Sequence, residues 1–507
     1  MDRYYVTTAI PYINSRPHIG FALEIVQADA VARWHRLLGH EVFFLTGTDE
    51  HGSKIDKMAK AAGTTPQVIA EHNSAAFADL KDLLNLSTDE FIRTSDQIRH
   101  WPGAQRLWQA LADAGDIYKD TYHGLYCVGC EAFITEKELV GGKCPIHQTE
   151  PESIQEDNYF FRLSKYGPQI AELIRSGQFR IEPTGRANEI LNVIESGLTD
   201  ISFSRPHSKL PWGVPVPGDP SQTMYVWCDA LSNYITGVGY GRDEDKFQRW
   251  WPASLHVIGK DILRFHAAIW PGMLLSAGLP LPRRMLVHGF ISSGGRKMSK
   301  SLGNVVDPAE VVERYGPDAL RYYLLREIPT TDDGDFSWQR FEELYNHELA
   351  DNLGNLVSRV VQMAHKYRDG QVPARGDSPA LGFDAPPDIA PQLEALDFNK
   401  AMLAINSWVA HLNNQVDRHQ PWQLAKSEAE QDQLSHVLYS LLDGIRIAAI
   451  NLYPFLPTTA QAIYHQLGLQ DIQPSQIDWQ RERSFGGLTP GASLGRAAVL
   501  FPKHDVQ

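Results

Sequence analysis

Three of the four cysteines lie close together in the first third of the chain, in two pairs of metal-binding type. Two residues separate Cys127 from Cys130, two separate Cys144 from His147, and thirteen lie between the pairs. Two such knuckles bring four soft ligands into one tetrahedron, which suits zinc, whereas clustered cysteines in a reducing compartment seldom form disulfides. We therefore predict one structural Zn²⁺. Two unrelated ligand pairs are the alternative, and the isolated Cys228 is expected to be a small buried residue.

A second candidate is the polar run Lys297-Met298-Ser299-Lys300-Ser301, between a predicted strand at 284–291 and a helical region from 308. Two ammonium groups and two hydroxyls on such a loop can close over a polyphosphate and neutralise charge that develops in a transition state. The first βα turn has no G-x-G-x-x-G, and the chain has no Walker-type motif, which disfavours dinucleotide and P-loop sites. A five-residue polar loop is usually just solvated, and that is the alternative when the run is taken alone.

The segment from Tyr4 to Phe21 combines a strand, a turn and the start of a helix. Bulky residues at 4–6 predict a strand, two prolines keep the next residues extended, and Gly20 opens an amphipathic helix over 20–38. Free amides and the positive end of the helix dipole then meet at one point, which suits an anion. His18 lies at this point. An ordinary βα turn with a packed or capping histidine is the alternative.

A second buried strand at 41–45 completes a β-α-β unit and predicts a parallel sheet. Its loop, 46–52, carries Asp49 and leaves the same edge of the sheet as His18. Ligands of open α/β sheets bind at that edge. Further strands are predicted at 91–94 and 255–258, and helices at 53–62, 66–84 and 103–114.

Two other regions have a different texture. Short β-like pieces, turns and many prolines from 117 to about 217 indicate a smaller inserted domain. From about 340 onward, apolar residues recur at spacings of three and four, which is typical of a helix bundle. A short strand-like run, 497–501, follows the bundle.

The composition limits the class of protein. The chain has 507 residues, which predicts about three domains. The net charge of −14 argues against a surface coated with basic residues for non-specific nucleic-acid binding. No apolar run approaches the length of a bilayer-spanning helix, and the N-terminus lacks a signal-peptide pattern, so we expect a cytosolic protein without a membrane partner.

Together these motifs resemble a known family. Pro17-His18-Ile19-Gly20 early and the Lys297–Ser301 run late resemble the paired signatures of class I aminoacyl-tRNA synthetases. Five further runs are similar to the methionyl-tRNA synthetase family, so the resemblance covers nearly the whole chain: Ala9-Ile10-Pro11-Tyr12, Leu45-Thr46-Gly47-Thr48-Asp49-Glu50-His51-Gly52, Tyr225-Val226-Trp227-Cys228-Asp229-Ala230, Ile258-Gly259-Lys260-Asp261-Ile262 and Asn355-Leu356-Val357-Ser358-Arg359.

The resemblance implies roles for individual residues. It places methionine against Ile10, Tyr12, Asp49, Trp227, Tyr234, Ile262 and His266. It implies that ATP is bound by His18, Gly20, Lys297, Ser299 and Lys300, of which His18, Lys297 and Lys300 are catalytic. A carboxylate can pair with the substrate ammonium, and aromatic faces suit a thioether. Plain core packing is the alternative for any single aromatic residue.

The resemblance also implies that the tRNA anticodon is bound by Asn355, Arg359, Pro421 and Trp422. Asn355 and Arg359 are four residues apart and share a helix face, planar polar groups can recognise base edges, and tryptophan can stack on an unpaired base. A solvated polar face and a capping tryptophan would explain the same residues.

Two features depart from the family pattern. The first signature normally ends in a second histidine, where this chain has Phe21. Asn14 and His288 are the nearby candidates to replace that histidine. Some family members carry an additional tRNA-binding dimerisation domain after the bundle, and this sequence ends at Gln507 without one, so we expect a monomer.

We therefore expect a cytoplasmic methionine–tRNA ligase that uses L-methionine, ATP with Mg²⁺, and tRNA(Met). The fold class is α/β, with a Rossmann-like parallel-sheet domain, a zinc-bearing insertion and an all-α bundle. The expected boundaries are 1–116 and 223–291 for the two catalytic halves, 117–222 for the insertion, 292–345 for the Lys297–Ser301 loop and linker, and 346–507 for the anticodon-binding bundle. A synthetase for isoleucine, valine, leucine or cysteine, and a non-catalytic tRNA-binding paralogue, are the alternatives.

Overall fold

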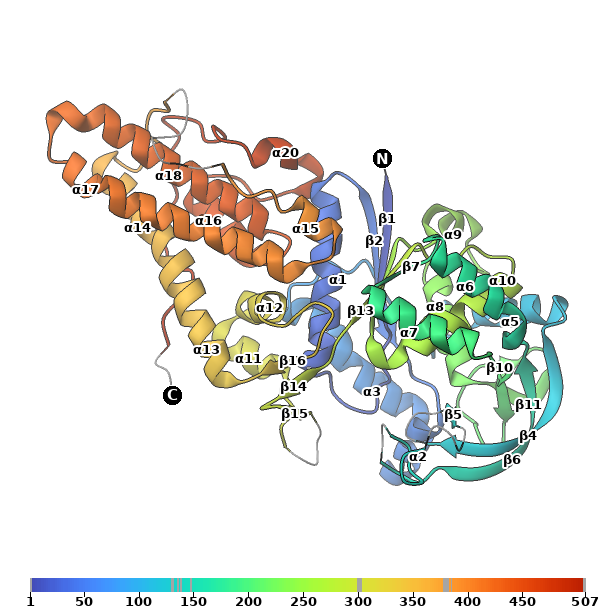
Figure 1. Cartoon of the computed structure of the whole chain (residues 1–507). Coiled ribbons are helices and arrows are strands. Elements are labelled where there is room, and N and C mark those ends of the chain that lie inside the picture. The colour runs from blue at the N-terminus through green and yellow to red at the C-terminus, as the bar shows by residue number, and fades with distance from the viewer. Residues whose placement is uncertain are drawn as a thin grey trace.

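Figure 1 shows the computed structural model, in which a parallel-sheet domain stands between a β-rich insertion and a helical bundle. The structure describes residues 2–128, 132–134, 136, 139–145, 148–298, 303–376, 383 and 385–504. The expected combination of a Rossmann-like α/β domain with a helical C-terminal region is confirmed.

Six parallel strands form the central sheet in the order β3-β2-β1-β12-β13-β7. Their bounds are β1 Arg3–Thr8, β2 Glu41–Thr48, β3 Glu90–Arg93, β7 Arg180–Glu182, β12 Leu255–Gly259 and β13 Arg284–His288. From β1 the chain moves through β2 to β3 on one side, and β12 and β13 later pair on the other side. The order therefore reverses between β1 and β12, and a crevice opens there at the carboxyl ends of the strands.

Helix α1 (Ile19–Leu37) connects β1 to β2 and is buried along most of its length. Small and branched residues such as Ala22, Val26 and Ala30 let it pack closely, since each is wholly buried. The other helices of this domain are α2 Ser53–Ala62, α3 Pro66–Ala78, α4 Leu80–Leu83, α5 Trp101–Asp113, α8 Val226–Thr236, α9 Glu244–Trp250 and α10 Trp270–Ser276. A π-helical turn, Phe265–Ile269, precedes α10.

The insertion contains an antiparallel sheet in the order β5-β4-β6-β8, and a smaller one in the order β10-β11-β9. The bounds are β4 Ile117–Cys127, β5 Ala132–Ile134, β6 Glu152–Phe161, β8 Ile201–Ser202, β9 Ser204–Pro206, β10 Pro215–Val216 and β11 Asp219–Met224. Two helices, α6 Gly167–Arg175 and α7 Thr184–Glu195, flank β7, which pairs with β13. The segment 117–222 therefore also contributes the edge strand of the central sheet.

A small sheet, β15-β14-β16, and three helices follow β13. Their bounds are β14 Ile291–Ser293, β15 Arg296–Lys297, β16 Gly334–Phe336, α11 Pro308–Tyr315, α12 Pro317–Arg326 and α13 Trp338–Leu344. Gly289 permits this module to approach the central sheet, because a Cβ there would lie 2.2 Å from the Asp332 carbonyl oxygen.

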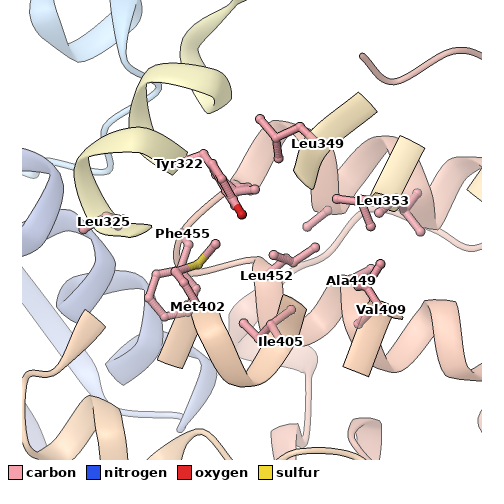
Figure 2. Close-up of a cluster of buried hydrophobic side chains, with 14 of the residues drawn as sticks. Tyr322, Leu325, Leu349, Leu353, Met402, Ile405, Val409, Ala449, Leu452 and Phe455 are labelled. Atoms are coloured by element: carbon pink, nitrogen blue, oxygen red, sulfur yellow. The ribbon is translucent and has the colours of Figure 1, made fainter. Parts of the chain in front are cut away.

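The C-terminal region is a bundle of α14 Asn355–Tyr367, α15 Ala390–Glu394, α16 Phe398–His419, α17 Pro421–Leu424, α18 Gln431–Leu452, α19 Pro457–Gln466 and α20 Trp479–Glu482. A π-helical stretch, Tyr345–Gly354, joins α13 to α14. In Figure 2, Leu349 and Leu353 of this stretch, Ile405 of α16 and Leu452 of α18 converge on one apolar cluster. The cluster extends to Tyr322 of α12, so the bundle core continues into the preceding module.

The strand expected at 497–501 is wrong, because this segment pairs with no other strand of the described chain. Phe501 instead packs edge-on against Tyr345, and the Tyr345 hydroxyl donates to the Pro502 carbonyl oxygen at 2.9 Å. Side-chain anchoring replaces the sheet. Within the described residues, no helix is both long and apolar enough to cross a bilayer.

Candidate functional site

A cavity of about 460 Å³ lies at the carboxyl ends of β1, β12 and β13. The segment after β1 supplies Ile10 and Tyr12, that after β12 supplies Asp261 and Ile262, and His288 ends β13. This is the switch point of the sheet, where the strand order predicts a ligand site. Of the expected methionine and ATP residues, Ile10, Tyr12, His18, Gly20, Asp49, Trp227, Tyr234, Ile262 and His266 line it.

His18 caps the N-terminus of α1 at the cavity wall. Its Nδ1 accepts a hydrogen bond from the backbone N–H of Gly20 at 3.0 Å, and burial lowers the pKa of His18. The imidazole is therefore neutral with its proton on Nε2, which is a donor suited to an anion. A Cβ on Gly20 would lie 2.7 Å from His18 Cε1, so glycine is required for this position of the ring.

Aromatic and apolar side chains form the deep part of the cavity. Trp227, on the first turn of α8, stacks on Phe265 with ring centroids 3.7 Å apart. Tyr234, two turns further along α8, lies 2.7 Å from His266 Nε2 through its hydroxyl. His266 Nδ1 donates to the Ile262 carbonyl oxygen at 3.0 Å, and burial lowers the pKa of His266 to about 4. Nε2 of the neutral ring therefore accepts a hydrogen bond from the Tyr234 hydroxyl, and this bond fixes the orientation of both side chains.

Asp49 lies beside Tyr12 because the loops after β1 and β2 are hydrogen-bonded to each other. The backbone N–H of Asp49 donates to the Pro11 carbonyl oxygen at 3.0 Å, and that of Ile13 donates to the Asp49 carbonyl oxygen at 3.3 Å. Asp49 is only 6% exposed. A carboxylate in this position suits an ammonium group at the mouth of an apolar pocket.

The position of the missing second histidine is filled by an aromatic ring. Phe21 lines the cavity and packs edge-on against Phe77, with centroids 5.5 Å apart. Asn14 and His288, the two expected substitutes, line the same cavity. His288 is already engaged, however, because Nε2 lies 2.9 Å from Glu24 and Nδ1 lies 2.8 Å from the Gly289 carbonyl oxygen.

Glu24 and His288 form a buried pair against the cavity. Glu24 Oε1 accepts the backbone N–H of Ala9 at 2.8 Å, and Oε2 takes the His288 contact. Burial favours neutral imidazole, but the hydrogen bond and charge of Glu24 outweigh burial and raise the pKa of His288. The pair ties the end of β13 to α1 and to the end of β1.

The first two residues of the Lys297–Ser301 run belong to the described chain. Ser292 pairs with Lys297 in the antiparallel β14–β15 hairpin, and Met298 lines the cavity. Ser299, Lys300 and Ser301 lie outside the described residues.

Half of the expected zinc ligands belong to the described chain. Cys127 ends β4, Cys144 lies between β5 and β6, and both are 1% exposed. Cys130 and His147 lie outside the described residues. In the part of the chain that is described, no group of three or more potential ligands gathers into a metal site.

The expected anticodon residues lie on two helices of the bundle, α14 and α17. Asn355 begins α14, Pro421 and Trp422 begin α17, and both helices lie toward the end of the bundle remote from the central sheet (Figure 1). Arg359 of α14 is held by Asp417 of α16, with Nη1 and Oδ1 3.1 Å apart.

Sequence reasoning missed several residues of the cavity. Glu24 follows Gly20 by one helical turn, so its position on the same face of α1 was a usable signal. Asp261 is adjacent to the expected Ile262. Lys54, whose ammonium lies 5.5 Å from the Tyr12 ring centroid, and the aromatic residues Phe265 and Phe290 have no spacing that marks them.

Comparisons with known proteins show which family this chain resembles. A family model described as tRNA synthetases class I (M) matches residues 4–153 and 137–361, and one for the anticodon binding domain of methionyl tRNA ligase matches 387–506. The chain is 42% identical to the methionine–tRNA ligase of Caldanaerobacter subterraneus subsp. tengcongensis, over 99% of this chain and 79% of that protein. It is 43% identical to that of Nostoc sp., over 99% and 97%.

Among solved structures, the chain is similar to Mycobacterium tuberculosis methionyl-tRNA synthetase in complex with methionyl-adenylate. The TM-score is 0.92 and the identity 41%, and the alignment covers 99% of this chain and 100% of that one.

Proposed function

The chain belongs to the methionyl-tRNA synthetase family of class I aminoacyl-tRNA synthetases, and we propose that its cavity activates L-methionine with ATP. The reaction is methionine–tRNA ligation, in which methionyl-adenylate forms first and the methionyl group is then transferred to tRNA(Met). The observation that carries the assignment of the site is the convergence of the nine expected residues above, from both halves of the sheet domain, on one cavity.

The deep, apolar part of the cavity binds the methionine side chain. Trp227 and Tyr234 face it with aromatic rings, which make favourable contacts with a thioether sulfur. The hydrogen bond between Tyr234 and His266 fixes the orientation of these two polar side chains in the wall of the pocket. Asp49 pairs with the substrate ammonium, so the α-carboxylate is directed toward the ATP side of the cavity.

In this proposal, ATP is bound by His18, Gly20, Lys297, Ser299 and Lys300. The methionine carboxylate attacks the α-phosphorus of ATP, and the bond to the bridging oxygen breaks as pyrophosphate leaves with the electron pair. The Nε2–H of His18 donates to phosphate oxygens, and the two lysines neutralise the charge that develops on them. Mg²⁺ accompanies ATP and screens its phosphates.

Transfer to tRNA follows in the same cavity. The hydroxyl of the terminal adenosine attacks the acyl carbon, and AMP leaves. Asn355, Arg359, Pro421 and Trp422 recognise the anticodon on the remote bundle, where the Asp417 contact presents the Arg359 guanidinium in a defined orientation.

The insertion holds one structural Zn²⁺ through Cys127, Cys130, Cys144 and His147. The donor set of three thiolates and an imidazole is of the type that binds zinc, and the burial of Cys127 and Cys144 suits a closed site.

Charging of tRNA tests the assignment. Purified protein with ATP and labelled methionine should charge tRNA(Met). Arg359→Ala should reduce charging by at least about tenfold while ATP–pyrophosphate exchange remains, because anticodon recognition uses the bundle whereas adenylation needs only the cavity. Binding of tRNA without charging, or charging with a different amino acid, would contradict it.

A further inference from the structure

Three buried polar side chains lie behind the cavity without lining it. His51 Nδ1 is 2.5 Å from Asp229 Oδ2, and His100 Nε2 is 2.7 Å from Asp229 Oδ1. All three residues are at most 1% exposed. A carboxylate this deep is costly unless both oxygens are hydrogen-bonded, and here each oxygen takes one imidazole N–H.

The two histidines beside Asp229 differ in the other contacts that their rings make. His100 Nδ1 lies 2.8 Å from the Thr236 hydroxyl, and Thr236 and Asp229 are two turns apart on the same face of α8. His51 Nε2 has no hydrogen-bond partner in the described part of the chain, so the Asp229 contact and edge-on packing against Trp101 and Trp212 together hold the ring. Burial alone would raise the pKa of Asp229, but the two histidines outweigh burial and lower it.

The His51–Asp229 contact joins two elements that each contribute residues to the cavity wall. His51 follows Asp49 by two residues on the loop after β2. Asp229 follows Trp227 by two residues on α8, which also carries Tyr234. Glu50, between Asp49 and His51, is anchored elsewhere, to Arg93 at 2.7 Å and to the Trp212 indole N–H at 2.6 Å.

We propose that His51, Asp229 and His100 are positioning residues that fix the distance between the ammonium subsite at Asp49 and the thioether subsite at Trp227 and Tyr234. The proposal rests on the proposed function, since it takes the two subsites from there. His51 holds the Asp49 loop against α8 through its contact with Asp229. His100 contacts both Asp229 and Thr236 and thereby fixes the orientation of the Asp229 carboxylate.

This arrangement makes the network a determinant of substrate length. Methionine must reach both subsites at once, so their separation selects the number of atoms between the amino group and the sulfur. Homomethionine, which has one more methylene between Cα and the sulfur, tests the fit. A single methylene is discriminated by about 10- to 200-fold in a rigid apolar pocket.

Two variants of His51 separate the effect of its hydrogen bond to Asp229 from the effect of a smaller side chain. His51→Ala removes the hydrogen bond, and His51→Asn keeps an amide N–H close to the position of Nδ1. In ATP–pyrophosphate exchange, we expect His51→Ala to raise KM for methionine at least about tenfold, because misplacing a binding group by about 1 Å costs up to about 100-fold. KM for ATP should change less than about twofold, and preference for methionine over homomethionine should fall. His51→Asn should restore most of the methionine KM and most of this preference.

The matched control is Asp443→Asn in the bundle, where Asp443 is equally buried and pairs with Arg446 at 2.7 Å. It should lower the melting temperature and leave both KM values unchanged. Equal rises in KM for methionine and ATP, an unchanged preference for methionine over homomethionine in His51→Ala, or a His51→Asn variant as impaired as His51→Ala would each overturn the proposal. Wild-type exchange is measured first, because its absence overturns the proposed function itself.

Discussion

Substituting alanine for Gly20 tests whether catalysis depends on the position of the His18 ring. The added Cβ would lie 2.7 Å from His18 Cε1 and 2.9 Å from Nδ1. Carbon atoms in contact are about 3.5–4.0 Å apart, so the ring must move by about 1 Å. A displacement of this size costs up to about 100-fold in rate, equivalent to about 2.7 kcal/mol in the barrier.

Stability should change little in the same variant. Losing the His18 cap costs about 1 kcal/mol, and replacing glycine by alanine within a helix returns about the same amount. Steady-state exchange kinetics should therefore show a large fall in kcat beside a nearly unchanged melting temperature.

Gly185 offers a matched control, because it is also the second residue of a helix, α7, and a Cβ there meets nothing within 4 Å. Gly185→Ala should keep full activity and gain up to about 1 kcal/mol of stability. Full activity in Gly20→Ala, or a loss of activity matched by unfolding, would refute the reasoning.

Four further predictions concern single residues. Lys300→Ala should lower the exchange rate by about 100-fold or more at an unchanged melting temperature, because it removes a charge that stabilises the transition state; unchanged exchange would count against its role. Phe21→His should speed adenylation if no other group replaces the second histidine, and an equal rate would show that other groups already do so. Metal analysis should find one zinc per chain, as a single four-ligand site requires, and Cys130→Ser should lose it; a folded, metal-free wild type would disprove the site. His266 has its pKa lowered from 6.5 to about 4, so KM for methionine should stay constant as pH falls from 8 to about 5. The unfolded chain takes up this proton near pH 6.5 and the folded chain only near 4, so the folded state should lose up to about 3 kcal/mol across that interval; a rise in KM centred near pH 6.5 would contradict the assignment.

Local sequence patterns were sufficient to predict those elements whose conformation depends mainly on neighbouring residues. The strand before Ala9 and the helix from Ile19 follow from bulky residues, prolines and apolar periodicity, and the structure has β1 and α1 there. Because parallel strands end at one edge, His18 and Asp49 were expected together, and both line the cavity. Ile10, Tyr12, Trp227, Tyr234, Ile262 and His266 were expected through family resemblance rather than spacing.

Contacts between distant segments could not be predicted in this way. His51 and Asp229 are 178 residues apart, and no spacing signals their contact. The short strand β7 lies within the insertion and pairs with β13, about a hundred residues further along the chain, so no local pattern indicates this pairing. Phe501 belongs to a run with strand propensity, but its packing against Tyr345 anchors it without a strand partner, so tertiary contacts override the local preference.

Amino-acid-dependent ATP–pyrophosphate exchange, measured with each of the twenty amino acids in turn, tests the central claim most directly. The cavity described here predicts exchange with L-methionine in the absence of tRNA, and with the other nineteen only at a small fraction of that rate. Exchange driven by a different amino acid, or no exchange with any of them, would contradict the account.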